Sequence, residues 1–129
     1  MIDDSESRAP VDQLEKELQK LRARFSDKLP GRVRDLGEEW KRLQEAGWNT
    51  QGARALHRSV HGLVGTAGSL GFAQVSYAAR VVARELLGLL ESAGAPTAGN
   101  ADEVHRLLVS IGDAVKEDEK AFAEGTSTE

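Results

Sequence analysis

From Leu56 to Phe72 the chain reads LHRSVHGLVGTAGSLGF. Apolar residues recur in this segment every three or four positions, which is the spacing of one face of an α-helix. They are Leu56, Val60, Leu63, Ala67 and Leu70. At about 100° per residue, His61 lies roughly opposite this apolar stripe. The segment therefore predicts a helix that buries one face and presents a histidine to solvent.

Glycines occur inside this predicted helix at positions 62, 65 and 68, and each costs roughly 1 kcal/mol relative to alanine. Gly62 lies on the flank of the helix, where a missing side chain suits close packing against a neighbouring helix. Gly65 and Gly68 lie on the same side as His61, away from the apolar stripe. Their missing side chains favour a second interpretation, in which the histidine is left bare so that the active site of another protein can reach it.

The pattern His-x-Leu-x-Gly-x-x-x-x-Leu-Gly, formed by His61, Leu63, Gly65, Leu70 and Gly71, resembles the motif of histidine phosphotransfer (HPt) domains. These domains are helical modules of two-component phosphorelays. The resemblance implies that His61 accepts a phosphoryl group from a receiver-domain aspartate, or from a kinase, and passes it to another response regulator. It also implies that Gly65 is the small residue that keeps the histidine face open.

Position 64 departs from the family pattern, because Val64 stands where HPt domains usually have a lysine that supports the phosphoryl group. This departure keeps an alternative function open: a non-phosphorylated helical interaction module, a pseudo-HPt, that binds a receiver or a kinase. A third hypothesis, a metal-binding bundle, depends on His57 and His61 at i and i+4. With no carboxylate nearby and Arg58 between the two histidines, we expect no metal site. We also expect no cofactor on this chain, and the resemblance places Mg²⁺ on the receiver partner.

Charge is distributed unevenly along the chain. The whole sequence has 21 acidic residues and 17 Lys or Arg residues, yet no Asp or Glu occurs between Ala46 and Arg84. Receiver domains, by the same resemblance, hold their phosphoryl group in a carboxylate-rich pocket, which a basic surface would attract. Chance clustering on a segment rich in glycine and alanine is the alternative. We expect partner docking by Arg54, Arg80 and Arg84, and support of the site by His57, Arg58, Val64, Gly65 and Gly68.

Several functional classes are disfavoured by composition. The net charge of −4 argues against a nucleic-acid partner. No apolar run approaches the ~20 residues of a membrane span, and the acidic start of the chain is unlike a signal peptide, so we expect a cytoplasmic protein without membrane contact. Cysteine is absent, which excludes disulfides and thiolate metal sites. Without an ATP-binding motif, the expected activity is that of a phosphocarrier rather than an enzyme.

The remaining pattern predicts helices throughout and a single all-α domain. We expect an antiparallel up-down four-helix bundle with an additional N-terminal helix, spanning 10–123, between disordered tails at 1–9 and 124–129. The additional helix begins near Pro10 and has an apolar stripe formed by Val11, Leu14, Leu18, Leu21 and Phe25.

Turn and capping residues predict where the helices begin and end. The Pro30–Gly31 pair is expected to end the N-terminal helix. The next helix ends near Gly47, and the helix with His61 ends at Gly71, a residue suited to a C-cap. The fourth helix stops before Gly94, and the fifth opens at Asn100, where Glu103 three residues later indicates a capping box.

Overall fold

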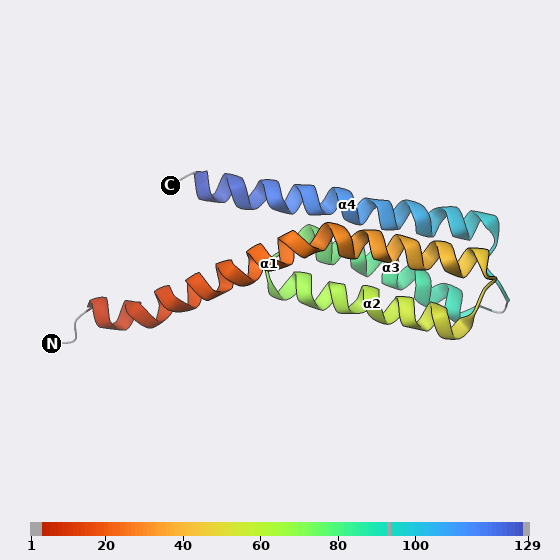
Figure 1. Ribbon diagram of the computed structural model, residues 1–129, viewed down its shortest axis with the longest axis horizontal. Helices are drawn as coiled ribbons and strands as arrows, with labels where there is room; N and C mark the ends of the chain where they lie inside the picture. The colour runs from red at the N-terminus through yellow and green to blue at the C-terminus, as the bar shows by residue number, and fades with distance from the viewer. Residues whose placement is uncertain (1–3, 93, 128–129) are drawn as a thin grey trace.

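The computed structural model describes residues 4–92 and 94–127, which form four helices. They are α1 (Asp4–Glu45), α2 (Thr50–Ser69), α3 (Ala73–Glu91) and α4 (Ala98–Ser127). Figure 1 shows the helices lying along one another, each running opposite to the one before it. α2 packs against α1 and α3, and α4 packs against the same two helices from the other side. The described residues contain no strand, so the all-α prediction is confirmed.

The core is built from the inward faces of all four helices. From α2, the side chains of Leu56, Val60 and Leu63 are fully buried, as the apolar stripe predicts. The other helices add Leu29, Leu36 and Trp40 from α1, Val75, Val82 and Leu86 from α3, and Val104, Leu108 and Ile111 from α4. Burial of one such aliphatic side chain stabilises a fold by about 1.5–3 kcal/mol. The back of α2 is therefore held firmly while its front stays open.

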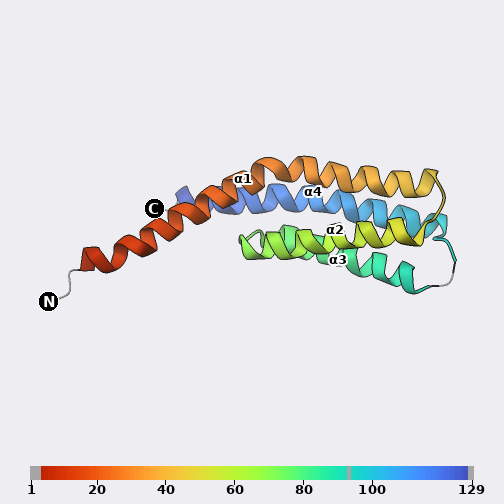
Figure 2. The same ribbon diagram turned by 60° about the horizontal axis from the view of Figure 1, so that its bottom comes forward.

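α1 runs without interruption through Pro30, so the predicted break at Pro30–Gly31 is wrong. A proline inside a helix removes one N–H donor and leaves the carbonyl four residues earlier without its usual partner. Leu29 and Leu36, on either side of the proline, are buried against the core, and this burial holds both halves in one helix. The helix bends instead of ending (Figure 2), which is the usual effect of an internal proline. The segment expected as an additional helix is the first half of α1.

The N-terminal half of α1 extends beyond the ends of α2 and α3 (Figures 1 and 2). Its apolar stripe is consequently open, with Val11, Leu14 and Leu21 exposed by 54%, 69% and 49%. From the same stripe, Phe25 packs against the core. Even with this stripe, none of the helices over residues 4–92 and 94–127 is long and apolar enough to cross a membrane.

The tails differ from expectation where they are described. Residues 4–9 begin α1, and residues 124–127 end α4, instead of forming disordered tails. The rest of the expected tails, 1–3 and 128–129, lies outside the described residues.

The end of α2 is closed by a glycine turn, as Gly71 predicts. Gly71 has a φ of 86°, and the N–H groups of Gly71 and Phe72 donate to carbonyls three and five residues earlier, at 3.2 and 2.8 Å. This pair of bonds defines a Schellman motif. Phe72 then enters the core, where its ring lies 4.9 Å, centroid to centroid, from both Phe25 and Phe122. The turn between α2 and α3 is thereby fixed at one end of the bundle.

The start of α3 is capped by a residue from α4. Phe72 is the N-cap residue of α3 and offers no side-chain acceptor. Asp118, which is only 5% exposed, accepts hydrogen bonds from the N–H groups of Gln74 and Val75 at 3.1 and 2.8 Å. Its carboxylate thus satisfies backbone donors that the helix itself cannot satisfy.

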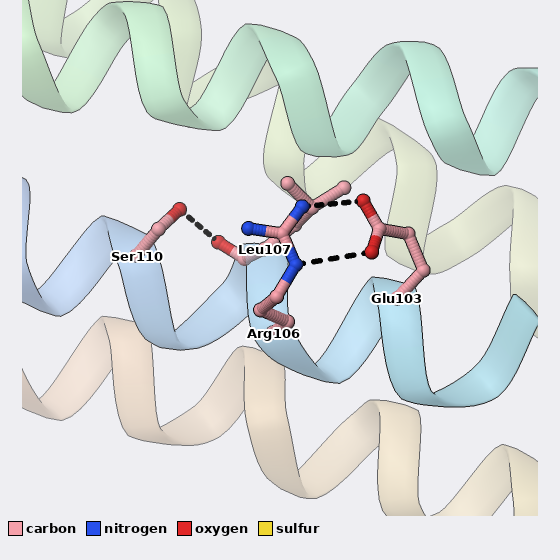
Figure 3. Close-up of polar contacts among 4 residues, drawn as sticks. All are labelled: Glu103, Arg106, Leu107 and Ser110. Atoms are coloured by element: carbon pink, nitrogen blue, oxygen red, sulfur yellow. Dashed lines mark hydrogen bonds and ion pairs between the residues drawn. The ribbon is translucent and has the colours of Figure 1, made fainter. Parts of the chain in front are cut away.

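α4 begins at Ala98, two residues before the Asn100 start predicted for it. The Thr97 hydroxyl accepts from the Asn100 N–H at 3.2 Å, and the Asn100 side-chain oxygen accepts from the Thr97 N–H at 3.0 Å. This reciprocal pair is the capping box, so the box proposed between Asn100 and Glu103 is wrong. Glu103 instead accepts from Arg106 (Figure 3), and that hydrogen bond lowers the pKa of the Glu103 carboxyl.

Candidate functional site

His61 lies on the exposed front of α2, with the buried Val60 and Leu63 behind it. One turn earlier, His57 is half-buried, and the two imidazole rings are nearly parallel, at 12°, with their centroids 6.1 Å apart. No hydrogen bond to either ring occurs within the described part of the chain. Both nitrogens of the exposed His61 ring are therefore available to a second molecule.

Gly65, one turn after His61, faces open space. A Cβ atom built at Gly65 has no heavy atom within 4 Å beyond its own helix backbone and chain neighbours. Packing thus gives no reason for a glycine here, although glycine weakens a helix by roughly 1 kcal/mol relative to alanine. This geometry agrees with the interpretation that a side chain at position 65 is absent to leave the histidine accessible.

Gly68, by contrast, has a packing role. A Cβ atom at Gly68 would lie 3.3 Å from the Ser76 Oγ of α3, which is tighter than ordinary contact. The same hydroxyl donates a 2.9 Å hydrogen bond to the backbone carbonyl of Val64. Close approach of α2 and α3 therefore accounts for the glycine at position 68. From its place on the same side as His61, the sequence predicts instead that Gly68 keeps the histidine accessible.

Val64 is half-buried and packs against the core cluster. Its side chain belongs to the seam between α2 and α3, and its carbonyl is held by Ser76. Position 64 consequently supplies apolar contact and no positive charge beside the histidine.

Ser76 also identifies the edge of α3 that borders the site. Arg80 and Arg84 follow Ser76 by one and two turns, so they continue the same edge. α2 and α3 run in opposite directions (Figure 1), so residues that follow Ser76 in α3 lie beside residues that precede Gly68 in α2. The stretch from Ser76 to Arg84 therefore runs alongside the stretch from Gly68 back to His61. Both arginines are exposed. They therefore line one flank of the histidine face.

Arg54 and Arg58 lie on α2 itself, before His61, and both side chains are exposed. In the described part of the chain, ion pairs occur elsewhere, on the first half of α1 and on α4. No ion pair neutralises Arg54, Arg58, Arg80 or Arg84 there. The acid-free segment of the sequence thus corresponds to a surface of unpaired cations around the histidine.

Arg32, from α1, was not among the predicted site residues. A terminal guanidinium nitrogen of Arg32 lies 3.6 Å from the position of a Cβ atom at Gly62. The sequence does contain a feature that points to Arg32. This arginine lies one turn before Leu36 and two turns before Trp40, on the helix face that these two buried residues turn toward the core. A role for Arg32 beside Gly62 follows only from the register between α1 and α2. A break at Pro30 gives no such register.

The other candidate residues add no site. His105 is exposed on α4, and the described residues contain no cluster of three or more His, Cys, Asp or Glu side chains that could hold a metal ion. No protein-family model, curated protein or solved structure matches the chain. A functional assignment therefore depends on the residues around His61.

Proposed function

We propose that the chain is an HPt-type phosphocarrier, an up-down four-helix bundle of the cytoplasm in which His61 accepts a phosphoryl group and passes it on. The observation that carries this proposal is the exposed imidazole, which has no hydrogen-bond partner among the described residues and lies one turn from the open position of Gly65. The donor is a receiver-domain aspartyl phosphate or a kinase, and the acceptor is a second response regulator.

The chemistry requires little from this chain beyond position and access. A neutral imidazole is an available nucleophile at neutral pH. The unprotonated ring nitrogen of His61 attacks the phosphorus of the aspartyl phosphate, and a P–N bond forms as the P–O bond to the aspartate breaks. The aspartate leaves as a carboxylate with the bonding electrons, and the second ring nitrogen keeps its proton. The receiver supplies Mg²⁺ and most of the stabilisation of the transferred group, as the metal does in phosphoryl transfer generally.

Electrostatics supports the same partner. A receiver pocket contains carboxylates and a phosphoryl group, and the cations around His61 are exposed and form no ion pair within the part of the chain that the structure describes. Complementary charge of this kind raises the association rate and keeps an acidic partner from being repelled by a chain whose net charge is −4.

A second candidate is the pseudo-HPt module, which binds a receiver or kinase without being phosphorylated. It is favoured by Val64, because that side chain packs into the seam between α2 and α3 and leaves the site without the usual lysine. In this case the partner binds to the same face but no phosphoryl group moves.

Transfer from purified receiver domains, charged with acetyl phosphate, separates these two functions. We expect an acid-labile, base-stable label on the chain, lost in His61→Gln and retained in His57→Gln and His105→Gln. These controls are matched, because each removes one imidazole from another position. Binding without a label would support the pseudo-HPt alternative, and a label retained in His61→Gln would refute the assignment of the site.

A further inference from the structure

Arg32 brings a positive charge from α1 to the edge of α2. Its side chain is half-buried, and its guanidinium lies over Gly62, the residue directly after His61. A long aliphatic stem can lie along apolar surface while its charged end reaches water. The charged end of Arg32 therefore emerges on the flank of the histidine face opposite to the flank lined by α3.

The Arg32 guanidinium has no anionic partner among residues 4–92 and 94–127. Neither an ion pair nor a hydrogen bond is formed by Arg32 in the described part of the chain. Arginine presents five N–H donors in a planar fork that matches a carboxylate. Filling the space beside Gly62 does not require a charge, so packing alone leaves the guanidinium unexplained.

The other end of the same helix pair gives a comparison. There, a Cβ atom at Gly52 of α2 would meet the Leu43 side chain of α1 at 2.8 Å, so an apolar residue covers the glycine. Near the histidine, an arginine takes the equivalent place over Gly62. The α1–α2 seam is thus apolar away from the site and cationic beside it.

We propose that Arg32 binds a carboxylate of the receiver domain that docks over His61, so that the partner contacts α1 as well as α2 and α3. This inference rests on the proposed phosphocarrier function and extends it by naming the second flank of the docking surface. With Arg80 and Arg84 on one side of the histidine and Arg32 on the other, an acidic partner is held from both sides of α2.

The test compares Arg32→Glu and Arg32→Gln with Arg34→Glu. Arg34 is a matched control, because it is exposed on the same helix two residues later and borders α4, near Asp102 and His105. Stopped-flow association with the receiver that labels the chain best is measured at low and high salt. We expect Arg32→Glu to slow association about tenfold at low salt, with a smaller effect of Arg32→Gln and little effect of Arg34→Glu. The differences should shrink at high salt because exposed charges are then screened.

A second arm labels the histidine without a protein partner, using phosphoramidate as a small donor. Equal labelling of the parent and the Arg32 variants is expected, since Arg32 acts on docking. Equal association rates for Arg32→Glu and Arg34→Glu would overturn the inference, as would slower phosphoramidate labelling in Arg32→Gln. Circular dichroism melting verifies that each variant is folded, and Arg32→Gln carries the test if charge reversal disturbs the fold. If the parent chain neither binds nor accepts label from any receiver, the proposed function fails, and this inference fails with it.

Discussion

Replacement of Gly65 should separate stability from function. A Cβ atom at this position meets open space, so alanine adds no clash, and it removes the conformational cost of glycine in a helix. We expect Gly65→Ala to stabilise the chain by about 1 kcal/mol. For a domain of this size the melting temperature should rise by about 3–5 °C. Leucine should be tolerated as well, because its side chain also projects into solvent.

Function should respond in the opposite direction. A leucine side chain one turn from His61, on the same face, covers the approach to the ring. Because displacement of reacting groups by about 1 Å can cost about 100-fold in rate, we expect Gly65→Leu to slow transfer by about that factor. Gly65→Ala should lie between the parent and the leucine variant.

Gly112 provides the matched control. It is a helical glycine of α4 whose Cβ position is also open, and over the described residues the backbone of α4 packs beside α1 and α3 and not beside α2. Gly112→Leu should shift stability similarly and leave transfer unchanged. The assay combines thermal melting with rapid-quench transfer from a charged receiver. Parental transfer rates in Gly65→Leu, or an equal loss in Gly112→Leu, would refute the access argument.

Three further predictions concern the frame and the charge of the site. Asp118→Ala should lower the free energy of unfolding by about 1–3 kcal/mol in urea denaturation, with a smaller loss for Asp118→Asn, because two backbone donors of α3 lose their acceptor; unchanged stability would contradict this capping role. Gly71→Ala should cost about 1–2 kcal/mol, since φ at this position is 86°; a melting temperature equal to that of the parent would contradict it. Arg58→Ala should slow transfer most among the four arginines, whereas Arg80→Ala and Arg84→Ala should mainly weaken salt-sensitive association; rates and salt dependence unchanged after removal of all four would make the acid-free segment a compositional accident.

The local pattern of the sequence predicts the parts of the fold that depend on local forces. The apolar stripe of α2 is buried where its spacing places it, and Gly71 ends the helix in a Schellman turn. Both features follow from helix periodicity and from the left-handed conformation that glycine accepts. The exposure of His61 follows from the same spacing.

Features that depend on distant segments escaped that reasoning. Pro30 is kept inside α1 because the buried leucines on both sides bind the helix to the core, and tertiary burial outweighs a local penalty. Asp118 caps α3 from a different helix, so the sequence near the start of α3 does not predict the cap. The role of Gly68 depends on the approach of Ser76, and the place of Arg32 depends on the register of α1 against α2. These contacts require the packed bundle.

The capping box of α4 is a different case, since its signal was present in the sequence. Thr97 is followed three residues later by Asn100, and the two form the reciprocal hydrogen bonds of a box. The usual pattern has Glu or Gln in the second position, which drew attention to Glu103. An asparagine side chain is long enough to accept a hydrogen bond from the Thr97 N–H. A search for capping boxes should therefore also allow asparagine at the second position.

The most direct test of the central claim is a complete relay. The chain is labelled by one charged receiver, freed from that donor, and then mixed with a second, unphosphorylated receiver and Mg²⁺. We predict that phosphorus NMR first detects phosphohistidine on the parent and on His57→Gln but not on His61→Gln, and that this signal then disappears as the second receiver gains the phosphoryl group. A label that forms on His61→Gln, or a phosphohistidine at residue 61 that no receiver can discharge, would contradict the account.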